Sequence, residues 1–163
     1  MLSPKTLACA LGGAALAALS LGASPSLAQG AGPFAGLAGS WSGGGTVSLS
    51  SGASERIRCR ATYAGGGSAL QMNLRCASSS YNFNLTSNVQ ANGNAISGSW
   101  TETTRNASGG ITGSVSGGQI QARVSGPTFT ANLAVSTRGN SQSIVIRSAG
   151  TELTGVNISL NRT

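Results

Sequence analysis

Residues 55–76 alternate apolar and polar side chains on both sides of a glycine-rich centre at residues 65–68. Side chains of a β-strand point to opposite faces in turn, so this pattern predicts two half-buried strands joined by a tight turn. When the strands are paired about that turn, apolar residues oppose one another throughout, and Cys59 lies opposite Cys76. A register shift of one residue would turn every apolar side chain to the wrong face. The turn and the cysteines therefore predict the same register and a Cys59–Cys76 disulfide.

Short stretches of the same alternation recur along residues 39–163, and turn-forming glycine, asparagine or serine residues separate them. Nine or ten such strands, each followed by a turn, are typical of an antiparallel meander. Closing the sheet into a barrel hides its edge strands. We therefore predict an all-β fold, a single antiparallel meander β-barrel of about 8–10 short strands, with a β-sandwich as the alternative. Leu153 is out of step with Val156, which predicts a β-bulge at Gly155.

The first 28 residues have the organisation of a secretory signal peptide. Lys5 precedes the apolar residues 7–21, and Ala28 follows as a small residue of the kind that a signal peptidase recognises. A membrane anchor is the competing interpretation, but the apolar stretch is short and Pro25 interrupts its end. The predicted organisation is a signal peptide at residues 1–28, a flexible lead-in at 29–38 and a β-barrel domain at 39–163.

The predicted domain retains an even pair of cysteines, Cys59 and Cys76. In an exported chain such a pair indicates a disulfide formed in an oxidising compartment. We therefore expect an exported protein, periplasmic or extracellular, that is not a transmembrane protein.

Two Gly-Ser-Trp triplets stand at predicted strand ends, at residues 39–41 and 98–100. The first opens the first strand and resembles the Gly-x-Trp signature of the calycin superfamily, the lipocalins and avidins. The chain is also similar to small exported bacterial proteins of unknown function. The calycin resemblance implies a barrel whose floor is closed by Trp41, and a binding role. It implies neither a lipocalin ligand nor biotin, because the Thr-Asp-Tyr triplet and the avidin set of tryptophans are missing.

The sequence contains neither histidine nor aspartate, and its only carboxylate side chains are Glu55, Glu102 and Glu152. This composition excludes a Ser-His-Asp or Cys-His arrangement. The two cysteines of the predicted domain are expected to be tied together rather than to bind zinc, and no phosphate loop or dinucleotide fingerprint is present. We therefore expect no catalytic residues, no metal and no cofactor, and we predict that the protein is not an enzyme.

Large side chains on the apolar strand faces are candidates to line a ligand cavity. A barrel of eight or more strands can enclose a small apolar molecule, so we expect a non-enzymatic binder of such a ligand. The candidate lining residues are Trp41, Tyr63, Met72, Phe83, Trp100 and Phe129. The alternative is that these side chains simply fill the core of a chain that has few aromatic residues.

A second candidate surface is the arginine face, which consists of Arg56, Arg58, Arg60 and Arg75 on the polar side of the hairpin. The predicted register sets Arg60 opposite Arg75, where like charges repel unless solvent or an anion separates them. Guanidinium groups suit phosphate and carboxylate, so the surface indicates an interaction module for an anionic envelope component. The alternatives are a solvated polar face and a small exported inhibitor or structural protein. Nucleic acid is not expected, because aromatic residues do not alternate with these arginines.

Overall fold

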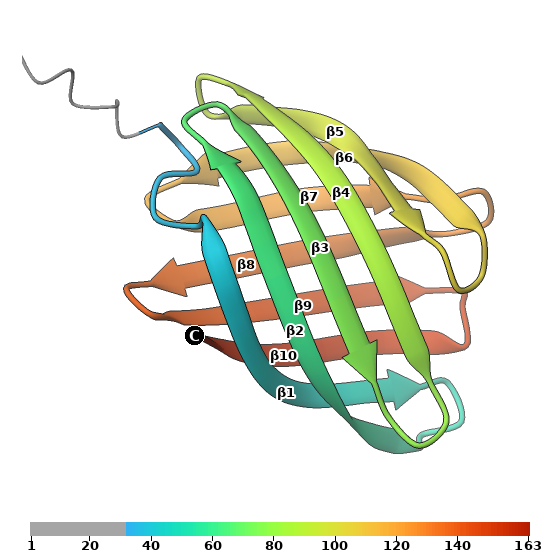
Figure 1. Ribbon diagram of the computed structural model, residues 1–163. Coiled ribbons are helices and arrows are strands. Elements are labelled where there is room, and N and C mark those ends of the chain that lie inside the picture. Colours follow the sequence, from blue (N-terminus) through green and yellow to red (C-terminus); the bar gives the residue numbers. More distant parts are fainter. Residues whose placement is uncertain (1–31) are drawn as a thin grey trace, which may run out of the picture.

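The computed structural model describes residues 32–163, which form a closed barrel of ten antiparallel strands (Figure 1). Each strand pairs with the next along the chain, and β1 pairs with β10 to close the sheet. The predicted meander barrel is confirmed, and the β-sandwich alternative is not adopted. The strands are β1 (Gly39–Leu49), β2 (Ser54–Gly66), β3 (Ala69–Ala77), β4 (Asn82–Asn92), β5 (Ala95–Glu102), β6 (Ala107–Ser116), β7 (Gln119–Ser125), β8 (Thr130–Arg138), β9 (Ser141–Ala149) and β10 (Leu153–Arg162).

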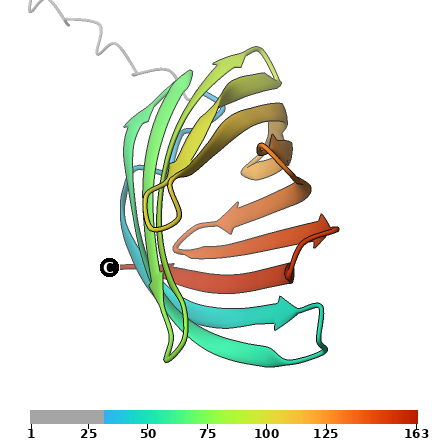
Figure 2. The same ribbon diagram turned by 90° about the vertical axis from the view of Figure 1, so that its right-hand side faces the viewer.

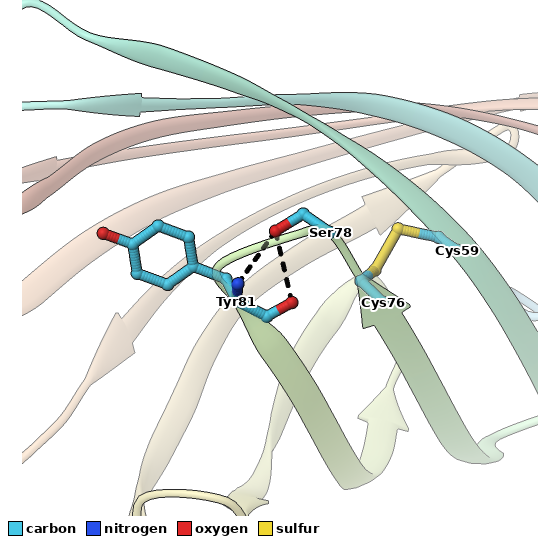
Figure 3. The surroundings of a disulfide bond; sticks show 4 residues. All are labelled: Cys59, Cys76, Ser78 and Tyr81. Carbon is cyan, nitrogen blue, oxygen red and sulfur yellow. Dashed lines mark hydrogen bonds between the residues drawn. A yellow bond between two sulfur atoms is a disulfide. The ribbon is translucent and has the colours of Figure 1, made fainter.

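The β2–β3 hairpin has the predicted register. Ala61 pairs with Leu74, and Cys59 pairs with Cys76. These two cysteines form the disulfide, with their Cα atoms 4.1 Å apart. Figure 3 shows that the bond joins the two strands just before the loop 78–81, in which the Tyr81 N–H donates to Ser78 Oγ at 2.8 Å. The disulfide therefore fixes the hairpin beside this loop.

The two ends of the barrel differ in how their strands are connected. At the end where the described chain enters and leaves, four turns of two residues join the strands, for example Gly93-Asn94 between β4 and β5. Positive φ angles at Gly93 and Gly139, 60° and 56°, allow such tight turns. At the other end the connections contain three or four residues. We call the first end the floor and the second the mouth; Figure 2 shows the barrel from a second side.

Strand β1 approaches β10 very closely. A Cβ atom at Gly45 would lie 1.9 Å from the Asn157 carbonyl oxygen, so only glycine fits there. Pairing between the strands is regular until Ser48, which faces Gly155, and then shifts so that Leu49 faces Leu153. The bulge therefore lies next to Gly155, where the sequence predicted it.

Part of the predicted flexible lead-in at residues 29–38 takes part in the core. Phe34 and Leu37 are 0% and 4% exposed. The Phe34 N–H donates to the Gly67 carbonyl at 3.2 Å, which ties the segment to the β2–β3 turn. Two apolar side chains fill the floor of the barrel, and their burial holds residues 32–38 in place. The predicted signal peptide and the start of the lead-in lie outside the described residues.

Apolar side chains from all ten strands point into the barrel and form one core cluster. The outer face carries mainly serine, threonine, asparagine and arginine. Within residues 32–163 the structure contains no helix that could cross a membrane.

Candidate functional site

The interior of the barrel contains a cavity of about 420 Å³. It runs from the mouth down to Phe34 and Tyr63 at the floor. Its wall is almost entirely apolar, with aliphatic side chains such as Leu85, Ile111 and Leu133 between the aromatic ones. A cavity of this size and chemistry lies within the usual range for small-molecule sites.

Five of the six predicted lining residues line this cavity. They are Tyr63, Met72, Phe83, Trp100 and Phe129. Trp100 and Phe129 lie beside each other, with ring centroids 5.7 Å apart. The Trp100 Nε1–H donates to the Ser125 carbonyl at 3.0 Å, so this indole presents its ring to the cavity while its polar atom is satisfied by the wall.

Trp41 does not line the cavity, which corrects the prediction for this residue. Its side chain is 1% exposed and packs in the floor. The Trp41 Nε1–H donates to the Leu37 carbonyl at 2.9 Å. The guanidinium carbon of Arg162 lies 4.2 Å from the indole centroid, and the same guanidinium donates to the carbonyls of Ala38 and Gly36. The lead-in covers Trp41, and this arrangement seals the floor.

Two consecutive hydrogen bonds between side chains complete the floor. The Tyr63 hydroxyl donates to Gln142 Oε1 at 2.8 Å, across the barrel from β2 to β9. Gln142 Nε2 then donates to Thr137 Oγ1 at 3.0 Å. Burial raises the pKa of Tyr63 far above its ordinary value, although its hydrogen bond to Gln142 acts in the opposite direction. This tyrosine is therefore neutral and serves to brace the wall.

Aromatic residues and one arginine form the mouth. The rings of Tyr81 and Phe83 are stacked, 6.4 Å apart and inclined by 10°. The Arg105 guanidinium carbon lies 4.9 Å from the Phe83 centroid and 5.9 Å from that of Tyr81. Both Tyr81 and Arg105 line the cavity, and the sequence reasoning did not identify either as a site residue. Their positions depend on two loops that meet only in the folded barrel, and no local pattern indicates that meeting.

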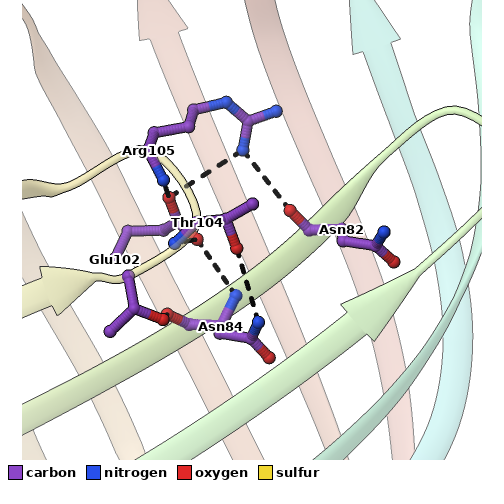
Figure 4. Close-up of polar contacts among 6 residues, drawn as sticks. Asn82, Asn84, Glu102, Thr104 and Arg105 are labelled. Atoms are coloured by element: carbon purple, nitrogen blue, oxygen red, sulfur yellow. Dashed lines mark hydrogen bonds and ion pairs between the residues drawn. The ribbon is translucent and has the colours of Figure 1, made fainter.

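Glu102 holds the loop on which Arg105 lies (Figure 4). Its side chain is buried, and its carboxylate accepts the N–H groups of Thr104 at 3.0 Å, Arg105 at 2.8 Å and Asn84 at 3.1 Å. The Arg105 guanidinium lies 3.9 Å away as an ion pair. Burial alone would raise the pKa of Glu102, but these hydrogen bonds outweigh it and hold the pKa below its ordinary value. The carboxylate therefore ties the β5–β6 loop to β4.

The arginine face lies on the outside of the barrel, as the alternation of side chains along β2 and β3 predicted. All four of its side chains are exposed, and Arg60 pairs with Arg75 across β2 and β3. Arg56 and Arg58 line an open hollow on the outside of the barrel, whose other walls include the small residues Gly44 and Ala77. Among residues 32–163, no carboxylate lies within ion-pair distance of these four guanidinium groups.

The described residues offer no metal site: within 32–163, no three histidine, cysteine, aspartate or glutamate side chains come together. The three glutamates of the sequence all lie at the mouth end, at the start of β2, the end of β5 and the β9–β10 loop. Tyr81 lies close to Glu152, with its hydroxyl 3.4 Å from the carboxylate. Burial and this neighbouring charge raise the pKa of Tyr81.

Comparison with known proteins gives a fold but no family. Neither a known protein family nor a curated protein matches the sequence. Among solved structures, Rv2717c from M. tuberculosis matches with a TM-score of 0.59 and 17% identity, over 79% of this chain and 94% of that one. The S-type phycobiliprotein lyase CpeS from Guillardia theta matches with a TM-score of 0.53 and 11% identity, over 77% and 88%. At these identities the likeness shows that the barrel fold is shared, and this agrees with the calycin-like architecture that the Gly-x-Trp triplet implies.

The second comparison corrects one prediction. The absence of histidine and aspartate led to the expectation that the protein is not an enzyme. The fold of this chain is shared with a phycobiliprotein lyase, so the missing residue types do not exclude activity on a bound molecule.

Proposed function

We propose that this barrel binds a small apolar ligand in its interior cavity. The observation that carries the proposal is the apolar volume itself. Water is held poorly in an apolar space of about 420 Å³, so much of the wall lacks close contacts until an apolar molecule fills it. An apolar ligand would contact the wall on every side.

The mouth supports this proposal because it offers a way in. The floor is closed by Trp41, Phe34 and the Tyr63–Gln142 bond. Among residues 32–163, the mouth is covered only by loops and by a half-exposed arginine. A protein with a similar fold, the phycobiliprotein lyase from Guillardia theta, acts on another molecule.

Two alanines of β8 allow a matched test. Ala131 faces the cavity, whereas Ala134 lies on the outer face of the same strand. Titration with the fluorescent apolar probe N-phenyl-1-naphthylamine should give saturable binding to the wild type. Ala131→Leu fills part of the cavity and should weaken binding at least several-fold, while Ala134→Leu should leave it unchanged. Absence of saturable binding, or equal effects of the two variants, would contradict a cavity site.

We further propose that the protein works outside the cytosol, in the periplasm or the medium. The Cys59–Cys76 disulfide supports this location, because such bonds persist in oxidising compartments. The measurement is the mass of the protein recovered from each cell fraction. A soluble cytosolic protein with an intact N-terminus would contradict the proposal.

The arginine face is a second candidate site, for a phosphate-bearing envelope surface. Four exposed guanidinium groups without carboxylate partners in the described structure, beside the hollow at Gly44, favour it. The test compares binding to vesicles of phosphatidylglycerol and of phosphatidylcholine. The double variant Arg58→Glu/Arg60→Glu should lose any preference for the anionic vesicles, whereas the same change at Arg123 and Arg138, away from this face, should keep most of it. Equal loss in both variants would indicate a general charge effect, and no preference in the wild type would end the idea.

A further inference from the structure

Ser87 places a hydroxyl group in the apolar wall of the cavity. It lies in the middle of β4, where it pairs with Met72 of β3 and Trp100 of β5. Its neighbours on the inner face of β4, Leu85 and Val89, also line the cavity. Ser87 is 7% exposed and lies on the cavity lining itself. A polar side chain thus interrupts an apolar face about halfway along the strand.

The hydroxyl of Ser87 has no hydrogen-bond partner among residues 32–163, unlike the other two buried polar side chains. Glu102 accepts three backbone N–H groups, and Gln142 bonds both Tyr63 and Thr137. In the described part of the chain, no side-chain polar atom is both fully buried and unpaired. The Ser87 oxygen is therefore reachable, and the space from which it is reached is the cavity.

A hydroxyl that faces an apolar space, where water is held poorly, has few hydrogen-bond partners, which is unfavourable. The indole of Trp100 cannot satisfy it, because the Trp100 N–H already donates to the Ser125 carbonyl. The side chain of Met72, opposite Ser87, is at best a weak acceptor. A ligand can supply the hydrogen-bond partner that the cavity wall does not offer to Ser87.

We infer that the ligand carries an uncharged oxygen, a carbonyl or hydroxyl group, within its apolar body, at the level of Ser87. The inference rests on the proposed binding function and specifies its ligand class. The ligand oxygen would lie well below the mouth, because Ser87 is five residues beyond the start of β4 and a strand advances about 3.3 Å per residue. Met72 and Trp100, which flank Ser87, carry no charge, so a charged group at this depth would lack a neighbouring counter-charge. The ligand class is an elongated apolar molecule with an internal keto or hydroxyl group.

The test uses pairs of probes that differ only in this oxygen. Benzophenone is matched with diphenylmethane, and 6-undecanone with undecane, each measured by displacement of N-phenyl-1-naphthylamine. The ratio of the two affinities within a pair is compared between the wild type and Ser87→Ala. This cycle cancels the different water solubilities of ketone and hydrocarbon. Loss of one hydrogen bond should shift the ratio about 2–12-fold against the ketone.

Two further variants control the result. Ser87→Thr keeps the hydroxyl and should keep the wild-type ratio. Ser99→Ala removes an exposed hydroxyl next to Trp100 and should also keep it. Hydrocarbon affinity should be unchanged or stronger in Ser87→Ala.

The outcomes separate this inference from the proposed function. If no probe binds the wild type, the binding function itself fails. If the probes bind and the ratio is the same in the wild type and Ser87→Ala, Ser87 is only a small spacer beside Trp100 and the inference is overturned. A shift confined to Ser87→Ala supports it.

Discussion

Both ends of the barrel pack an arginine over an aromatic ring, yet one end is sealed and the other is accessible. At the floor, Arg162 lies 4.2 Å from the Trp41 centroid, and its guanidinium is bonded to two carbonyls of the lead-in. At the mouth, Arg105 lies 4.9 Å from the Phe83 centroid with a side chain that is 48% exposed. The same pair of residue types therefore serves as a fixed plug in one place and as a solvent-facing rim in the other.

The difference arises from what covers each pair. Residues 32–38 lie across the floor with Phe34 and Leu37 buried, and two-residue turns hold the strands together around them. The mouth has no such covering segment in the described structure, and its loops contain three or four residues. Burial by a tethered segment, rather than the arginine–aromatic contact, decides which end is closed.

The largest expected effect is at the floor aromatic residue. Trp41→Ala should destabilise the barrel by about 3–5 kcal/mol, because it removes a fully buried indole and leaves a cavity. Phe83→Ala at the mouth should cost about 1–2 kcal/mol, since this ring is only partly buried. Urea unfolding of both variants measures the two values. Equal losses would remove the distinction between the two ends.

Next in size is the disulfide, which fixes the β2–β3 hairpin beside the mouth loop 78–81. Replacing Cys59 and Cys76 by serine should cost about 3 kcal/mol, mainly through a less constrained unfolded chain. Urea unfolding of wild type with and without reductant should reproduce the same difference. A stability that does not respond to reductant would mean that the bond does not form in solution.

The two arginines give a smaller effect. Arg162→Met should cost about 1–2 kcal/mol, because it loses the contact with Trp41 and its hydrogen bonds to the lead-in. Arg105→Met should change stability by less than about 0.5 kcal/mol, as expected for a half-exposed ion pair. Its effect should be on the rate of probe entry, measured by stopped-flow fluorescence. A changed entry rate in Arg162→Met together with an unchanged rate in Arg105→Met would contradict an entrance at the mouth.

The smallest effect is the pH dependence from Glu102. Its pKa is lower in the folded barrel than the ordinary 4.5, so the unfolded chain binds the proton more tightly. The carboxylate therefore stabilises the fold above about pH 4.5, and this contribution is lost as the pH falls through the folded pKa. Glu102→Gln should flatten the acid side of a stability profile measured between pH 2 and 6. An unchanged loss of stability at low pH would show that other groups cause it.

The sequence predicted the parts of the fold that follow from local alternation. Period-two patterns predicted the strands, and the Cys59–Cys76 pair predicted the register of one hairpin. The turn after each strand predicted the closed meander. The lead-in was missed because Phe34 and Leu37 belong to no alternating stretch, and their burial depends on the barrel that they cover.

The candidate site was predicted only in part, for a similar reason. Parity places Phe83 and Trp100 inside the barrel, but it does not distinguish a cavity wall from the floor, so Trp41 was misplaced. Tyr81 and Arg105 come together only through two loops distant in sequence. Ser87 did carry a signal, since it is polar and shares the parity of the apolar Leu85 and Val89. A polar residue on an apolar face is informative even when its partner is unknown.

The most direct test of a ligand cavity that is open at the mouth and sealed at the floor uses the two tryptophans as reporters. Trp100 lines the cavity and Trp41 does not. Tryptophan emission is followed during titration with 6-undecanone, which does not absorb at the emission wavelength, in Trp41→Phe and Trp100→Phe. We predict a saturable spectral change in Trp41→Phe, where Trp100 remains, and none in Trp100→Phe. A saturable change in Trp100→Phe, where Trp41 remains, or no change in either variant, would contradict the account.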